Sequence, residues 1–296
     1  MVPPGSGKTM LAERLPGILP DLDVDSAIEA AALRSLRGLP VGAELDLRPP
    51  FQAPHHTASA VALIGGGSGM VQPGALSLAS HGVLFLDEAP EFPRTVLDSL
   101  RQPLESGRIT IHRARMSATF PASAQLVLAA NPCPCGNAGA ADLECRCTPM
   151  QQRRYLARLN GPLLDRVDLQ LRVEKAGIAT VRMQADGVVG SRSTAEVADA
   201  VRLARARAAA RLAPLGCGRN ADLSGGALRR PELRPAPGAT ESVDRALARG
   251  QISMRGYTRI QRVAWSLADL EGVARPTADH IAEALYYRVR TAAGGQ

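Results

Sequence analysis

Short apolar runs separated by glycine- and proline-containing loops fill roughly the first 175 residues, and this pattern predicts the sheet of an α/β fold. Three of these runs, residues 83–86, 125–129 and 169–173, are expected to be strands. Residues 108–113 alternate with period two instead, which predicts an exposed hairpin arm.

The pattern changes to helical periodicity after Lys175. A linker is expected at residues 185–193, and Ser193–Glu196 forms a capping box that opens a helix. Further helices are predicted near residues 258–270 and 277–291. The sequence therefore predicts two domains, an α/β core over residues 1–180 and a smaller helical domain over residues 190–296.

The composition of the chain excludes some classes of function and is compatible with others. No run of about 18 apolar residues is present and no secretion signal is recognised at the N-terminus, so a cytoplasmic protein without a membrane partner is expected. The net charge of +7 is compatible with an acidic partner such as nucleic acid. Aromatic residues make up only 3% of the chain, which excludes base stacking as the main binding mode.

A phosphate-binding loop is predicted at the start of the sequence. Residues 3–9 end in Gly-Lys-Thr, as does the motif G-x-x-x-x-G-K-[ST], in which backbone N–H groups and the lysine contact phosphates. Lys8 is one of only two lysines, whereas all the other basic residues are arginines. Val2 occupies the place of the motif's first glycine, so a chance Gly-Lys-Thr in a turn remains the alternative. The residues expected to bind the nucleotide are Pro4, Gly5, Ser6, Gly7, Lys8 and Thr9.

Two carboxylates follow the apolar run at residues 83–86. At the carboxyl edge of a parallel sheet, Asp87 would join the Thr9 hydroxyl in holding Mg²⁺, and Glu88 would activate a water molecule. The alternative is a strand that ends in solvated acids. The Gly-Lys-Thr loop comes first in the chain and the apolar run with its two acids follows it. This order favours ATP binding with Mg²⁺ as cofactor.

Four cysteines form two C-x-C pairs separated by nine residues. Clustered thiols in a cytoplasmic chain suggest a closed tetrahedral zinc site before disulfides. Four reduced thiols without a metal are the alternative, and Cys217 lies apart. The expected zinc ligands are Cys133, Cys135, Cys145 and Cys147.

A metal site formed by histidines is not expected. His55 and His56 are adjacent, and neighbouring side chains of an extended segment point to opposite faces.

Several segments together resemble the magnesium-chelatase-like AAA+ ATPases, and within them the ComM/YifB group. The resemblance covers most of residues 3–173 and, more weakly, residues 252–271. It implies an AAA+ P-loop core with a C-terminal helical lid. The matching segments are Pro50–Ser59, Pro73–Ala79, Gly82–Glu88, Thr119–Ala122, Asn131–Gly136 and Gly161–Asp168.

The resemblance implies three further catalytic residues. Asn131 would be the sensor residue that places the attacking water. Arg166 would be the arginine finger that acts on a neighbouring subunit's ATP, and Arg255 would be the sensor arginine of the lid. Whether Arg255 acts on its own subunit or on a neighbour is left open, and the alternative for each arginine is a surface charge.

The resemblance also implies a hexameric ring that moves or branch-migrates DNA during transformation and recombination. Residues 64–70 resemble the tip of a helix insertion, and residues 108–116 resemble the hairpin that precedes the sensor residue. Arg113 and Arg115 would share one face of that hairpin and could contact a DNA backbone, an ordinary solvated hairpin being the alternative.

Two other functions stay open. The ATPase subunit of a metal chelatase shares the same core motifs, although the cysteine cluster favours the DNA motor. The printed sequence also starts inside the phosphate loop, so the family's first strand and N-terminal domain are expected to be missing from it. The third possibility is therefore a truncated fragment that does not hydrolyse ATP.

Overall fold

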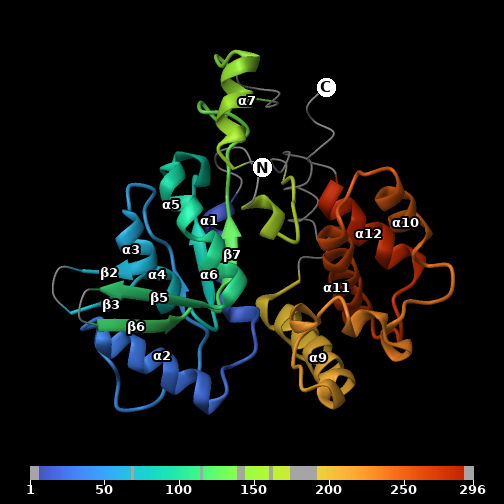
Figure 1. Cartoon of the computed structure of the whole chain (residues 1–296), viewed down its shortest axis with the longest axis horizontal. Helices are drawn as coiled ribbons and strands as arrows, with labels where there is room; N and C mark the ends of the chain where they lie inside the picture. Colours follow the sequence, from blue (N-terminus) through green and yellow to red (C-terminus); the bar gives the residue numbers. More distant parts are fainter. Residues whose placement is uncertain are drawn as a thin grey trace. The chain divides into compact units, whose positions relative to one another are not determined.

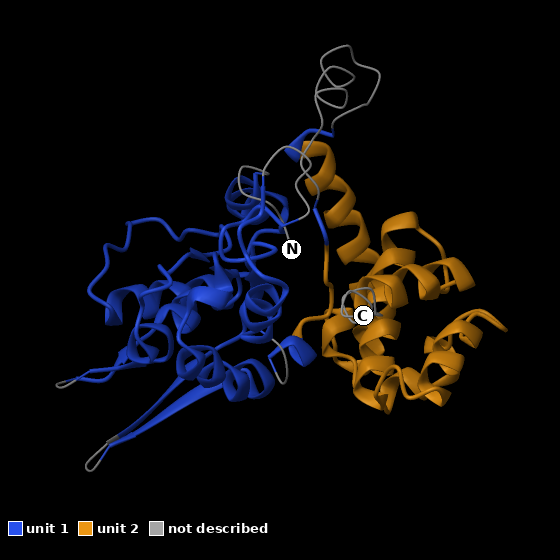
Figure 2. Cartoon of the chain, turned by 90° about the horizontal axis from the view of Figure 1, so that it is seen from above, with its two compact units in different colours: residues 1–166, 172–194 blue, residues 167–171, 195–296 orange. Residues whose placement is uncertain are grey.

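The computed structural model describes residues 7–67, 70–113, 116–138, 144–159, 163–173 and 192–289 (Figure 1). The chain divides into two compact units, which Figure 2 shows in separate colours. Unit 1 comprises Met1–Arg166 and Arg172–Thr194, and unit 2 comprises Val167–Leu171 and Ala195–Gln296.

Unit 1 is built on a parallel sheet with the strand order β1 (Phe51–Gln52), β4 (Val83–Leu86) and β7 (Gln125–Leu128). Every residue of the central strand β4 is buried, with at most 2% of its surface exposed. The strand predicted at residues 83–86 is confirmed, and the strand predicted at residues 125–129 is confirmed over Gln125–Leu128. Strand β1 has only two residues, too few to give a sequence pattern.

Both faces of β4 are covered. Leu84 and Leu86 belong to the main core of unit 1, whereas Phe85 belongs to a separate cluster with Ala12 of helix α1 (Lys8–Arg14). A parallel strand that is buried on both faces reads as a continuous apolar run, which explains the sequence of β4. The Phe51 and Phe85 rings also stack, with their centroids 6.2 Å apart.

Four short helices of unit 1 pack around the sheet. Those that contribute side chains to the main core are α3 (Ala60–Ile64), α4 (Ala75–Leu78), α5 (Arg94–Ser99) and α6 (Arg101–Ser106). Helix α2 (Val24–Leu36) begins where the Asp23 carboxylate accepts the Ser26 N–H at 2.8 Å. Helix α7 (Pro149–Ala157) begins with a capping box between Thr148 and Gln151.

Two antiparallel hairpins complete unit 1. Strands β5 (Arg108–Arg113) and β6 (Met116–Pro121) pair along their whole length, which confirms the predicted hairpin arm. Ile109 on β5 is buried and Ile111 is half-buried, whereas Thr110 and His112 are exposed. Strands β2 (Gly65–Gly66) and β3 (Gln72–Pro73) form the smaller hairpin.

The strand predicted at residues 169–173 is wrong. The structure describes this segment without a strand, and both Leu169 and Leu171 are exposed. The Gln170 N–H donates to the carbonyl of Tyr287 in unit 2, at 2.9 Å. The alternation of Leu169 and Leu171 therefore does not correspond to a strand of a buried sheet.

Unit 2 is helical and consists of α9 (Thr194–Leu212), α10 (Glu241–Ala248), α11 (Met254–Glu271) and α12 (Ala278–Val289) with short 3₁₀ turns. These bounds confirm the predicted helices. Trp265 is fully buried, and the Arg211 guanidinium lies 4.0 Å from its ring centroid. Arg211 also pairs with the buried carboxylate of Asp269, so this buried charge has a cationic partner.

A search of the described helices finds none that is both long and apolar enough to cross a lipid bilayer.

The sheet depends on a close backbone approach between β4 and the segment that enters β1. The Val83 N–H donates to the Pro50 carbonyl at 2.8 Å. A Cβ atom at Gly82 would lie 2.0 Å from that carbonyl oxygen and 2.6 Å from the Pro50 nitrogen. Because these contacts are with backbone atoms, no side chain can move aside to relieve them.

Gly82→Ala is therefore expected to lower the free energy of unfolding by about 3 kcal/mol through overpacking. Urea unfolding followed by circular dichroism measures the change. At Gly42 an added Cβ would meet nothing closer than 3.5 Å, so Gly42→Ala is the matched control and should change stability by less than about 1 kcal/mol. Equal stability of the two variants would contradict this account.

Candidate functional site

The carboxyl ends of β4 and β7 lie level with each other. The two strands pair from Val83 opposite Gln125 to Leu86 opposite Leu128. Beyond the strands the pairing continues, since the Ala129 N–H donates to the Leu86 carbonyl at 3.0 Å and the Ala89 N–H donates to the Ala129 carbonyl at 2.8 Å. The residues that follow each strand are therefore held at one edge of the sheet.

The chain turns sharply after β4, at the two acidic residues. Glu88 adopts a left-handed backbone conformation with φ 48° and ψ 42°. A residue with a side chain enters this region only at a cost in energy, and such positions cluster at functional sites. The Glu88 N–H donates to the Asp87 Oδ1 atom at 2.8 Å, which fixes the orientation of the Asp87 carboxylate.

Helix α1 brings the predicted phosphate-loop residues to the same edge. Gly7 precedes the helix with φ 76°, a conformation that glycine adopts at little cost. The Thr9 hydroxyl donates to the Asp87 Oδ2 atom at 3.0 Å. The Lys8 ammonium donates to the Asn131 Oδ1 atom, two residues beyond the last paired residue of β7. Pro4, Gly5 and Ser6 lie outside the described residues.

Two effects act on the pKa of Lys8 in opposite directions. Partial burial lowers the pKa of the Lys8 ammonium from its ordinary value, and the negative charges of Asp87 and Glu88 oppose that shift. The structure thus brings five predicted residues together, with a cation, a hydroxyl, an amide and two carboxylates. These are the group types that bind Mg²⁺ and phosphate oxygens and that accept a proton from water.

The expectation that His55 and His56 point apart is wrong. Their ring centroids are 4.0 Å apart, because the chain bends into a turn at His56. The His56 Nδ1 atom lies 3.5 Å from the Glu88 Oε2 atom. Sequence analysis missed this contact, because β1 has only two residues and gives no pattern that would place the loop after it.

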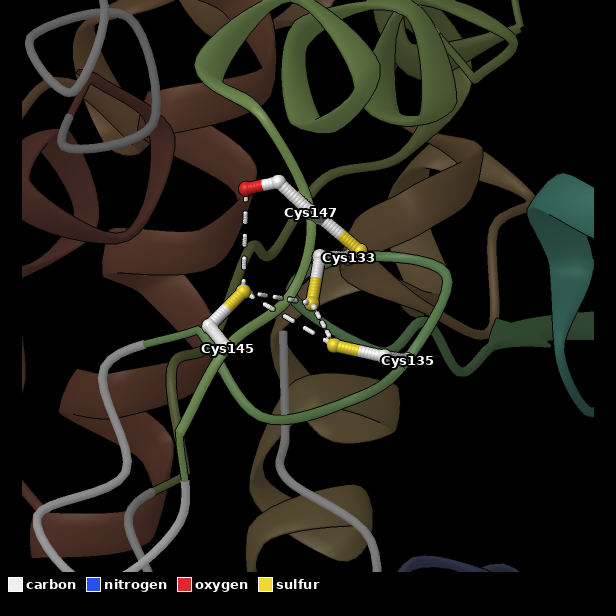
Figure 3. Close-up of side chains that lie close together, drawn as sticks. All are labelled: Cys133, Cys135, Cys145 and Cys147. Carbon is white, nitrogen blue, oxygen red and sulfur yellow. Dashed lines mark hydrogen bonds between the residues drawn. The ribbon is translucent and has the colours of Figure 1, made fainter.

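Four sulfur atoms converge in the loop after Asn131, as Figure 3 shows. The Cys133 Sγ atom lies 3.3 Å from the Cys135 Sγ atom and 3.7 Å from the Cys145 Sγ atom, and all four Sγ atoms lie within 4.8 Å of one another. This donor set fits one tetrahedral metal ion, and the cluster could therefore hold a metal. The cysteines involved are Cys133, Cys135, Cys145 and Cys147.

Neighbouring groups fix this cluster in place. Cys133 is fully buried, and its Sγ atom accepts the Ala138 N–H at 3.3 Å. The Gln152 side chain donates both to the Cys145 Sγ atom at 3.5 Å and to the Cys147 carbonyl at 3.2 Å. Hydrogen bonds from the Asn137 backbone and the Cys133 thiol lower the pKa of Cys135 to about 6, so its thiolate is available at neutral pH.

The structure describes three of the predicted arginines. Arg166, in a 3₁₀ turn at Leu164–Arg166, donates to the Glu105 carboxylate at 2.6 Å. It lines a cleft of about 380 Å³ together with residues of α5 and α6. Arg255 is exposed in the first turn of α11, and Arg113 is exposed at the end of β5. Arg115 lies outside the described residues.

Fold and site together define the class of protein: a P-loop AAA+ core of α/β type followed by a C-terminal helical domain. The family model described as magnesium chelatase subunit ChlI matches residues 1–181, and the model of that subunit's C-terminal domain matches residues 191–288. The chain belongs to this magnesium chelatase ChlI family.

Relatives align along nearly the whole chain. An uncharacterised protein of Mycobacterium tuberculosis is 50% identical over 288 residues, which are 97% of this chain and 56% of that protein. The competence protein ComM of Haemophilus influenzae is 42% identical over 290 residues, and the YifB protein of Escherichia coli is 42% identical over 291 residues. These two alignments each cover 97% of this chain and 54% of the relative. The chain thus spans about half the length of the curated relatives it matches.

Proposed function

We propose that this chain carries the ATP-hydrolysing core of a ring-forming AAA+ motor that acts on DNA in the cytoplasm. The observation that carries the proposal is the convergence of Lys8, Thr9, Asp87, Glu88 and Asn131 at one edge of the sheet. These residues come from three separate segments of the chain. Their grouping in space therefore makes a chance Gly-Lys-Thr turn a poor explanation.

Each residue has a role that follows from its chemistry. Lys8 supplies positive charge to the β- and γ-phosphates, and Thr9 and Asp87 would hold Mg²⁺. A bound Mg²⁺ would neutralise phosphate charge. Glu88 accepts a proton from the attacking water, and the Asn131 side chain orients that water.

We propose that Arg166 acts between subunits of a homo-hexameric ring. Its ion pair with Glu105 holds it in a cleft that residues of α5 and α6 line. In the ring, Arg166 would exchange Glu105 for the phosphate charge of a neighbouring subunit's ATP. We further propose that unit 2 is the lid and that Arg255 is its nucleotide-sensing residue.

The DNA partner is supported by the similarity to the competence protein ComM and by the hairpin arm. Arg113 lies exposed at the end of β5, where its charge can meet phosphates, and Arg115 is the next arginine along the chain. A second candidate function, the ATPase subunit of a metal chelatase, is supported by the description of the matching family. The response of the ATPase to DNA separates the two.

We also propose that the four cysteines bind a structural Zn²⁺ ion. Four thiol ligands form a closed set with no open position, so the ion would stabilise the loop without taking part in the reaction. The loop begins two residues after Asn131, and the ion would therefore help to fix the position of that side chain.

Branched or single-stranded DNA is expected to raise the ATPase rate of the purified chain, and Glu88→Gln should lower the rate at least about a hundredfold by removing the proton acceptor. Phosphate release measures both effects. Turnover that DNA leaves unchanged would favour the chelatase alternative. Turnover that persists in Glu88→Gln would contradict the assigned base, and no turnover in either chain would favour a non-hydrolysing fragment.

Arg166→Ala is expected to abolish hydrolysis when it is the only chain present. Mixing it with Lys8→Ala should restore part of the rate, because a ring then contains interfaces with one intact lysine and one intact arginine. Arg101→Ala, which removes another arginine of the same cleft, serves as the control and should stay active. Failure of the mixture to recover any activity would argue against action between subunits.

The purified chain is expected to contain one zinc ion, measured by inductively coupled plasma mass spectrometry. Cys133→Ser should lose the metal because it removes a buried ligand, whereas Cys217→Ser should retain it. Removal of the metal with a chelator should also lower the melting temperature, since binding energy contributes to folding. A metal content that is the same in both serine variants would contradict the proposed site.

A further inference from the structure

Unit 2 contains four arginines for which the proposed ATPase reaction gives no role. One lies on α9, one directly precedes the 3₁₀ turn Asn220–Asp222, and two lie on α11. The Asp222 carboxylate interacts electrostatically with an arginine of each helix, so the three elements meet around it. We call this group the arginine cluster, and its members are Arg205, Arg219, Arg259 and Arg262.

The 3₁₀ turn of the arginine cluster is fixed against both helices. The Asn220 side chain accepts a hydrogen bond from Arg211 of α9 at 2.8 Å and donates one to Asp269 of α11 at 2.8 Å. Leu223, directly after the turn, is fully buried, and its carbonyl accepts the Arg262 Nε–H at 2.8 Å. The cluster is therefore held in place by the packed interior of unit 2, and a ligand does not have to order it.

Two carboxylates neutralise part of the cluster. Asp222 accepts two hydrogen bonds from Arg219, at 2.9 and 3.1 Å. Asp168 accepts one from Arg259 at 2.6 Å. Within this set, four guanidinium groups face two carboxylates, which leaves an excess of two positive charges. Such an excess attracts an anion.

Arg205 has no hydrogen bond or ion pair with any residue in the described part of the chain. Its side chain is nevertheless half-buried. Burial, followed by the positive charge of Arg219, lowers the pKa of Arg205 from its ordinary value, and the charge of Asp222 opposes that shift. A guanidinium stays protonated even so, and burying a charge costs energy unless an opposite charge compensates it. An anion from outside the chain would supply that compensation.

We propose that the arginine cluster binds the phosphate backbone of DNA and that Arg205 contacts a phosphate directly. The guanidinium group presents its N–H donors in a planar fork that matches two oxygens of a phosphate. DNA carries phosphates at regular short intervals, so one strand can meet several arginines of the cluster. Aromatic residues make up only 3% of the chain, and contacts from arginine to phosphate therefore have to carry most of the affinity.

The inference rests on the DNA partner of the proposed function and adds a second contact surface to it. The hairpin arm of unit 1 is the first such surface, and the arginine cluster belongs entirely to unit 2. Binding at the cluster requires neither ATP nor hydrolysis. It can therefore be measured separately from the ATPase reaction.

Fluorescence anisotropy of a labelled oligonucleotide, measured over a series of salt concentrations, tests the role of Arg205. Arg205→Ala is expected to weaken binding about fivefold and to lower the slope of log K against log salt by about one, because one phosphate contact is lost. Arg205→Lys keeps the charge and should recover most of the affinity. Arg249→Ala removes an exposed arginine outside the cluster and is the matched control, which should stay within about twofold of the parent.

A second variant gives a change of the opposite sign. Asp222→Asn removes a negative charge and releases Arg219 from its ion pair, so it is expected to tighten DNA binding about threefold at low salt. Damage to the fold would weaken binding instead. Phosphate contacts do not read sequence, and each variant should therefore change the affinity for two unrelated oligonucleotides by the same factor.

The outcomes separate this inference from the proposed function. Absence of DNA binding by the parent chain would overturn the DNA partner and, with it, the role of the arginine cluster. Binding that Arg205→Ala weakens no more than Arg249→Ala would overturn the role of the cluster alone. Binding by Asp222→Asn that is no tighter than that of the parent would also overturn it, whatever the effect of Arg205→Ala on folding.

Discussion

The pairing of β4 with β7 is the constraint on which the candidate site depends. It continues past both strands through the backbone of Ala129, which bonds to Leu86 on one side and to Ala89 on the other. The acidic turn and Asn131 are therefore fixed relative to each other by backbone hydrogen bonds before any side chain contributes. Helix α1 then needs to supply only Lys8 and Thr9 to complete the group.

The same constraint reaches the neighbouring segments. Strand β1 is held to β4 by the close approach of Pro50 to Gly82, and it carries His56 to the edge. On the other side, the loop that follows β7 contains the buried Cys133, two residues beyond Asn131. A metal ion bound there would stabilise the loop next to the proposed nucleotide site. The site is thus assembled from the ends of strands, and its flanking loops contain the contacting rings of His55 and His56 and the thiol cluster.

Sequence reasoning predicted the parts of this arrangement that leave a strong local pattern. Strand β4 reads as four apolar residues followed by two acids because helices bury both of its faces. The hairpin of β5 and β6 shows period two because only one of its faces is buried. The cysteine cluster was predictable because its four residues lie close together in the chain as well as in space.

The remaining features depend on pairings between distant segments. Strand β1 has two residues, so nothing in the sequence indicates that its loop returns to Glu88. The alternation of Leu169 and Leu171 suggested a strand, but the backbone between them pairs with Tyr287 of unit 2. Arg166 forms an ion pair with Glu105, which lies sixty-one residues earlier in the chain. The motif that suggested a role for Arg166 does not indicate this pairing.

Binding of ATP with Mg²⁺, followed by isothermal titration calorimetry, tests the central claim most directly, because it asks whether this sheet edge is a nucleotide site independently of turnover. We predict that the parent chain binds ATP only when Mg²⁺ is present and that Lys8→Ala weakens binding at least about tenfold by removing the charge-assisted contact. Binding of equal strength in the parent and in Lys8→Ala, or no binding by the parent, would contradict the account.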